Sequence, residues 1–99
     1  MDTLQVIAEP RRRDILGLVW DEEVAASDIA AHFDVTFGAV SQHLAVLRDA
    51  GLVKVRKDGN RRMYEADKDA LAPYEEILKT MWKDTLRDLA ATIEAEESK

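Results

Sequence analysis

The sequence predicts a mainly α-helical domain that carries one small β-hairpin. Apolar residues recur at steps of three and four over most of the chain, which is the period of helices that bury one face. Two such segments are separated only by a short stretch at 34–36. A turn signal at 58–60 separates two runs of strand-forming residues. The 99 residues suit a single domain, 1–99, with a modest core.

The first third of the chain predicts two helices that meet at a proline. An apolar pattern that includes Leu4 and Ile7 pauses before Pro10, and proline suits the first turn of a new helix because its missing N–H is not needed there. The second helix has an apolar stripe of Ile15, Leu16, Leu18 and Val19. The arginine run 11–13 is poorly placed for the helix dipole. We interpret it as solvated surface or as partners of Asp14, with an auxiliary phosphate contact as the alternative.

Two helices joined by a short turn are predicted in the middle of the chain. Ser27 is expected to cap a short helix that ends at Phe33, after a brief strand near residue 24. Thr36 is expected to cap a longer helix over about 37–50, and Gly51 follows where a left-handed residue is needed. This arrangement is a helix-turn-helix.

A β-hairpin is predicted directly after this pair, over about 52–66. Its first run alternates apolar and polar residues, and Asp58-Gly59-Asn60 is a strong hairpin signal. A hairpin in this position is a wing, so the predicted fold is a winged helix-turn-helix. A last helix is predicted over about 73–96, beginning at Pro73. Its apolar stripe is too wide for a lone surface helix on so small a domain, which predicts self-association.

The charge distribution points to a polyanion as the binding partner. The formal net charge is −6, yet residues 36–66 hold six basic side chains against three acidic ones. Positive charge therefore gathers on the segment that contains the longer middle helix and the wing.

The outer face of the longer middle helix suits contact with DNA. Val40, Leu44 and Leu47 are expected to face the core, which leaves Gly38, Ser41, Gln42 and Ala45 outside. Gln42 can pair with adenine through both amide atoms, and Ser41 can serve a base or a phosphate. Thr36 and the helix N-terminus offer N–H groups to phosphate. A solvated surface is the alternative for this face alone.

Basic side chains of the wing are candidates for phosphate or minor-groove contact, with a solubilising turn as the alternative. They are Lys57, Arg61 and Arg62. The two arginines alternate faces, so we expect one to reach DNA and the other to brace the sheet, without assigning which. His43 lies on the flank of its helix, where packing competes with a DNA contact. His32 is expected to be structural or solvent-facing.

Several classes of function are not expected. The chain has no cysteine, which excludes disulfides and thiol chemistry. No Ser–His–Asp spacing or glycine-rich phosphate loop stands out, so we expect no enzyme and no cofactor. Asp84 and Asp88 could bind a divalent ion weakly, but such a pair is more often solvated, and we expect no metal site. Without a signal peptide or a long apolar run, we expect a soluble cytoplasmic protein that does not bind membranes.

The middle of the chain closely resembles the signature of the ArsR family of bacterial winged-helix repressors. The matching residues are Thr36-Phe37-Gly38-Ala39-Val40-Ser41-Gln42-His43-Leu44, then Leu47-Arg48 and Ala50-Gly51-Leu52-Val53. The stretch from Ala8 to Leu16 resembles the usual opening of the family, and the resemblance covers roughly Leu4 to Leu89.

The resemblance implies a homodimer that pairs through long first and last helices, binds imperfect inverted repeats in promoters and blocks transcription until an effector releases it. We therefore predict double-stranded DNA as a partner, contacted by Thr36, Phe37, Gly38, Ser41, Gln42, His43, Lys57, Arg61 and Arg62. The predicted dimer contacts are Leu4, Ile7, Tyr74, Met81, Trp82 and Leu89.

The sequence departs from the family pattern in three places. Phe37 stands where the family often has a polar residue, commonly glutamine, so one contact is lost or becomes apolar. The stretch 23–26 lacks the cysteine pair of many metal-sensing members, and the last helix lacks histidine. We therefore expect no metal sensing.

Two alternative functions remain open at the level of sequence. One is a protein-interaction module that uses this fold to act on another regulator without binding DNA, which the acidic net charge favours and the basic segment 36–66 opposes. The other is a sensor whose small-molecule effector lies against Trp82 at the dimer seam.

Overall fold

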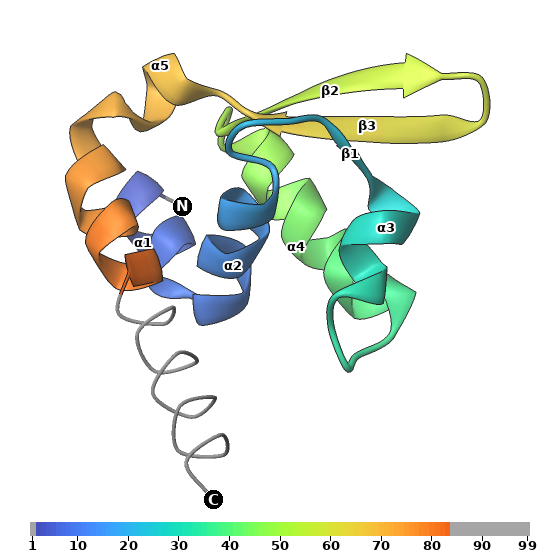
Figure 1. Ribbon diagram of the computed structural model, residues 1–99, viewed down its shortest axis with the longest axis horizontal. Coiled ribbons are helices and arrows are strands. Elements are labelled where there is room, and N and C mark those ends of the chain that lie inside the picture. Colours follow the sequence, from blue (N-terminus) through green and yellow to red (C-terminus); the bar gives the residue numbers. More distant parts are fainter. Residues whose placement is uncertain (1, 84–99) are drawn as a thin grey trace, which may run out of the picture.

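Helices of the chain pack against one side of a small antiparallel sheet (Figure 1). The computed structural model describes residues 2–83. Its helices are α1 (Thr3–Ala8), α2 (Pro10–Leu18), α3 (Ala26–Ala31), α4 (Phe37–Asp49) and α5 (Lys68–Leu71), followed by the 3-10 turn η1 (Ala72–Tyr74) and helical residues 75–83. Its strands are β1 (Val24–Ala25), β2 (Val53–Asp58) and β3 (Arg61–Ala66), in the order β1-β3-β2. The predicted mainly helical winged helix-turn-helix is confirmed.

The first helix is shorter than expected. Asp2 caps α1 through a hydrogen bond from the N–H of Gln5 at 2.9 Å, and the Gln5 side chain accepts from the Asp2 N–H in return. The helix is only six residues long because Glu9 is extended (φ −77°, ψ 118°). A residue that precedes a proline, here Pro10, is disfavoured from helical geometry. The long N-terminal helix is therefore not found among the described residues.

Two members of the arginine run, Arg12 and Arg13, hold α1 against α2 rather than lying free in solvent. Arg12 Nε donates to the carbonyl oxygen of Val6 at 2.7 Å. Arg13 Nη1 donates to the carbonyls of Ile7 and Ala8 at 2.9 and 2.8 Å. These carbonyls lie at the end of a helix, where no intrahelical N–H can reach them. Arg12 and Arg13 supply the missing donors, which corrects for these two the expectation of solvated side chains or of partners of Asp14 and nearby acids.

The expected cap of α3 is also corrected. The N-cap of α3 is Ala25, without a side-chain hydrogen bond, and Ser27 already lies inside the helix. Ala25 belongs to β1, where it pairs with Met63 of β3. Strand pairing keeps Ala25 extended (φ −69°, ψ 147°), so the helix can begin immediately after it. The brief strand expected near residue 24 is confirmed.

The core lies between the helices and the inner face of the sheet. Its largest fully buried side chains include Ile15, Leu16, Ile29, Leu47, Leu71 and Leu78. Two backbone bonds fix the wing to this core: the N–H of Ala66 donates to the carbonyl of Val19, and the N–H of Asp67 donates to that of Leu52, both at 2.9 Å. Within residues 2–83, no helix is long and apolar enough to cross a membrane.

Candidate nucleic-acid interface

Helix α4 begins and ends as its sequence predicts. The Thr36 hydroxyl accepts from the N–H of Ala39 at 3.1 Å, which confirms it as the N-cap. Gly51 has φ 74°, the left-handed conformation that terminates a helix and that other residues rarely adopt. Val40, Leu44 and Leu47 are buried against the core. These three contacts fix the rotation of α4 about its axis and therefore decide which side chains face outward.

The outward face of α4 is short, polar and accessible. Gly38, Ser41 and Gln42 are exposed, as the helical spacing of the apolar residues predicts. Ala45, which was also expected outside, is half-buried. An added Cβ at Gly38 would meet only the Thr36 hydroxyl at 3.9 Å, so no other described residue crowds the helix at this position. Phe37 is 55% exposed, which is unusual for a phenylalanine. Apart from the Phe37 ring, the small side chains of this face allow α4 to approach a groove closely.

The wing carries its basic side chains on two different faces. Residues Lys57 and Arg62 are directly opposite each other in the β2–β3 register. They share a face with Tyr64 because side chains two apart on a strand point the same way. Tyr64 is buried against the helices, so the Lys57–Arg62 pair extends this inner face toward the tip. At the tip, Gly59 has φ 63°, which a two-residue hairpin loop requires.

Two other wing arginines are held by acids of the domain body. Arg61 Nη2 donates to Asp28 Oδ2 in α3 at 3.0 Å. Arg56 Nε donates to Glu23 Oε2 before β1 at 2.9 Å, and this contact lowers the pKa of Glu23. Sequence spacing gives no sign of these pairs, because each joins residues 33 positions apart. The contacts of Glu23 and Asp28 with the wing were therefore not predicted.

A hollow of about 360 Å³ separates α4 from the wing. Phe37, Ser41 and Leu44 line it from α4, and Arg62 and Tyr64 line it from β3. The structure thus brings together the start of α4 and the inner face of the wing. A sugar-phosphate strand that passes between a helix in the major groove and a wing would lie in such a hollow.

His43 faces the domain body rather than the outer face of α4. It is half-buried. Burial lowers its pKa below the usual value, and the nearby charge of Arg12 lowers the pKa further. This environment favours the neutral imidazole. His32 is exposed.

The predicted dimer residues fall into three groups. Leu4 and Met81 are exposed, by 59% and 39%. Ile7 is buried in the core of its own chain. The half-buried Tyr74 and Trp82 pack against that core. Leu89 lies outside the described residues, as do Asp84 and Asp88. Within residues 2–83, no cluster of three or more side chains could hold a metal ion.

Comparison with known proteins places this geometry in a family. The family model of bacterial regulatory proteins of the arsR family matches residues 9–55. The HTH-type transcriptional regulator Rv2034 of Mycobacterium tuberculosis (strain ATCC 25618 / H37Rv) is 36% identical over 92 residues, which cover 93% of this chain and 86% of that protein. The chain belongs to the ArsR family. As an ArsR-family protein with this fold, it is a DNA-binding transcriptional regulator.

Other ArsR-type proteins agree with this assignment. The arsenical resistance operon repressor of Staphylococcus xylosus is 37% identical over 68 residues, which cover 69% of this chain and 65% of the repressor. The crystal structure of a possible transcriptional regulator for arsenical resistance superposes with a TM-score of 0.71 at 42% identity, covering 93% of this chain and 96% of that one. The crystal structure of NolR from Sinorhizobium fredii superposes with a TM-score of 0.70 at 30% identity, covering 80% and 79%.

Proposed function

We propose that this ArsR-family regulator is a homodimeric cytoplasmic repressor that binds an inverted-repeat operator. The observation that carries the proposal is that the start of α4 and Arg62 of the wing line one hollow, with Lys57 opposite Arg62 in the strand register. In a two-fold dimer, two copies of α4 would enter successive major grooves about one helical turn apart. The alternative of an interaction module that does not bind DNA is not favoured, since the relatives are named as transcriptional regulators and repressors.

In each protomer, different residues contact the bases and the phosphates. Gln42 and Ser41 read base edges, with Phe37 in apolar contact beside them. The hydroxyl of Thr36 caps α4, whose first N–H groups bind phosphate. Lys57 and Arg62 contact the phosphate backbone, since neither has an ion pair within residues 2–83. Arg61 braces the wing, because Asp28 already binds its guanidinium.

The dimer face lies on α1 and the helix over 75–83. Leu4 is 59% exposed, Ile77 50% and Met81 39%. Ile77 and Met81 are four residues apart and therefore share one side of that helix. Exposed apolar side chains that recur on one helix face mark an interaction surface. Ile77, which was absent from the predicted dimer residues, joins the proposed face, whereas Ile7, Tyr74 and Trp82 support it from within the chain.

Fluorescence anisotropy with labelled DNA tests the proposal directly. The probe is the DNA upstream of the protein's own gene, and the control is a scrambled duplex of equal length and composition. We expect binding of two chains per site, a preference of at least about 10³ over the scrambled duplex, and affinity that falls steeply with salt. Equal binding to both duplexes would overturn sequence-specific repression. One chain per site would overturn the two-fold model.

A further inference from the structure

A second hollow, of about 570 Å³, lies between α2, the end of α3 and the helix over 75–83. Aromatic side chains line it: Trp20 from the residues after α2, Phe33 from those after α3, and Trp82 from the last helix. We call it the aromatic hollow. Its volume is in the range of small-molecule sites, roughly 300–1,000 Å³. Such sites are mostly apolar with a few polar groups at the edge, and this lining has that composition.

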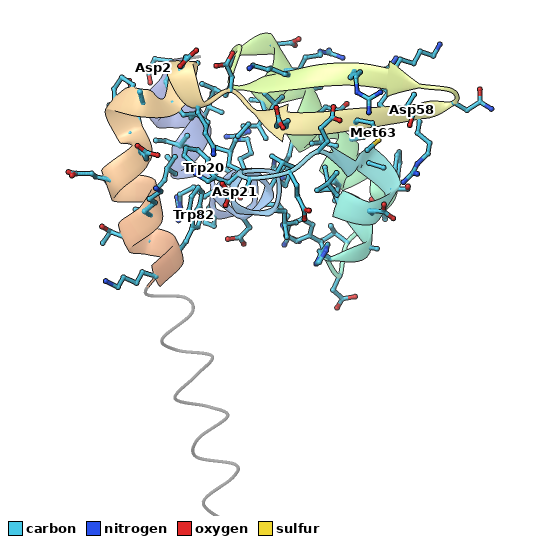
Figure 2. All side chains as sticks on the ribbon, turned by 45° about the horizontal axis from the view of Figure 1, so that its top comes forward. Asp2, Trp20, Asp21, Asp58, Met63 and Trp82 are labelled. Carbon is cyan, nitrogen blue, oxygen red and sulfur yellow. The ribbon has the colours of Figure 1, made fainter. Side chains whose placement is uncertain are left out.

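The tryptophans of the aromatic hollow are held in fixed positions. Trp82 Nε1 donates to the carbonyl oxygen of Arg13 at 3.0 Å. The Trp20 and Trp82 rings meet edge to face, with centroids 5.3 Å apart and planes at 65° (Figure 2). Gly17 permits the close approach of Trp82, because an added Cβ would lie 3.3 Å from the indole ring. Glycine weakens a helix by about 1 kcal/mol relative to alanine, yet α2 contains one at this point.

The rim of the aromatic hollow offers one unpaired carboxylate to a cation. The lining includes the carboxylates of Asp14 and Asp21 against one ammonium, that of Lys79. Lys79 is bound to Glu75 at 3.3 Å, and Asp21 is bound to Lys68 at 3.0 Å. Asp14 is exposed and has no ion pair or hydrogen bond to another described side chain. An incoming cation would therefore meet a free carboxylate.

A ring of this hollow already binds a cation of the chain itself. The guanidinium carbon of Arg11 lies 5.1 Å from the centroid of Phe33. Within about 6 Å, the ring quadrupole attracts a positive charge. A planar ring could extend the edge-to-face cluster of Trp20 and Trp82, while its amine reached Asp14.

The aromatic hollow is separate from the two surfaces proposed above. None of its lining residues belongs to α4 or the wing. On the last helix, Lys79 and Trp82 line the hollow, whereas Ile77 and Met81 lie on the opposite flank. Occupation of the hollow is therefore compatible with both the proposed dimer and the proposed DNA contacts.

We propose that the aromatic hollow is a binding site for a planar aromatic molecule that carries a protonated amine. The rings of Trp20, Phe33 and Trp82 hold the aromatic plane, and the carboxylate of Asp14 binds the amine. The proposal does not depend on the proposed repressor function, because binding is measured without DNA.

Tryptamine is a suitable probe, with indole-3-acetate as the matched anion of the same ring. Calorimetry measures both affinities on the full chain, and nitrogen-edited NMR follows the two indole N–H signals, which are distinguished in Trp20→Phe. We expect saturable tryptamine binding that shifts both signals, and indole-3-acetate binding roughly three- to tenfold more weakly, as one exposed charge allows. Asp14→Arg should reverse this order.

Glu22→Arg is the control, since it makes the same change of charge at an exposed position outside the lining. It should leave the preference for tryptamine unchanged. Absence of saturable tryptamine binding would overturn the proposal. If Asp14→Arg prefers tryptamine as strongly as the original chain does, Asp14 does not bind the amine. If Glu22→Arg reverses the preference equally, the effect comes from the overall charge of the protein and not from Asp14.

Discussion

The carboxylate of Asp28 binds the Arg61 guanidinium at 3.0 Å and thereby ties the start of α3 to the first residue of β3. A second pair, Arg56 with Glu23 at 2.9 Å, holds the other strand of the wing to the segment before β1. Both pairs are exposed, so each contributes little to folding stability. Their effect is geometric, because they restrict the wing that carries Lys57 and Arg62.

Arg62→Gln should weaken DNA binding more than Arg61→Gln does. The Arg62 guanidinium is uncommitted within residues 2–83, whereas that of Arg61 is bound to Asp28. Each phosphate contact that is lost makes the fall of log K with log salt less steep by about 1. The substitution would remove one such contact per protomer. Anisotropy titrations over a range of salt measure this slope. A larger fall for Arg61→Gln would assign the phosphate contact to Arg61 instead.

Gln42→Ala should relax specificity at one base pair of each half-site. Gln42 is exposed on the outer face of α4, and a bidentate amide contact to adenine discriminates by about 1–3 kcal/mol. A panel of operators with single base-pair changes measures the effect position by position. Uniform weakening over the whole panel would show that Gln42 contacts the backbone.

Phe37 should make the affinity depend on a thymine methyl group. Its ring is 55% exposed at the start of α4, and phenylalanine contacts this methyl in the major groove. Replacement of the relevant thymine by deoxyuridine should weaken binding about fourfold, the value of one buried methyl group. Phe37→Gln should abolish this dependence. If no deoxyuridine substitution in the operator changes the affinity, Phe37 does not read a base.

Ile77→Glu should shift the protein from dimer to monomer. Ile77 is 50% exposed on the proposed dimer face, and a buried unpaired carboxylate would oppose association. Sedimentation velocity measures the mass in solution. Glu76→Gln, at an exposed neighbouring position, serves as the control and should remain dimeric. A dimeric Ile77→Glu protein would place the interface elsewhere.

His43 should make stability decrease at mildly acidic pH. Burial holds its folded-state pKa below the usual value of 6.5. As the pH falls through 6.5, the unfolded state takes up a proton that the folded state does not, so the free energy of unfolding decreases until the folded-state pKa is passed. Urea unfolding at pH 7.5 and 5.5 measures the difference, which should be smaller in His43→Gln than in His32→Gln.

Local signals in the sequence were enough to predict the helix-turn-helix and the wing. The cap at Thr36, the terminator Gly51 and the tip at Gly59 each act within a few residues, so their geometry can be inferred without the tertiary structure. The apolar positions of α4 then fixed its outer face. For this reason the predicted exposure of Ser41 and Gln42 is confirmed.

The errors and omissions involve contacts between distant or differently oriented segments. Ser27 has the composition of a cap, but pairing of Ala25 with Met63 sets the start of α3. The arginine run meets the carbonyls of α1 only because of the bend at Glu9. The partner of Arg61 comes from 33 residues away. None of these contacts has a local sequence signal.

The acids that hold the wing arginines also influence how this protein would search a genome. Among the six basic side chains of 36–66, Arg48, Arg56 and Arg61 are ion-paired within the described chain. Random DNA is bound through phosphates alone, so a guanidinium that keeps its acidic partner adds nothing to binding of a wrong sequence. Such a regulator would stay on non-specific DNA for short times rather than slide along it over long distances. Its residence time at the operator would depend mainly on base recognition by α4.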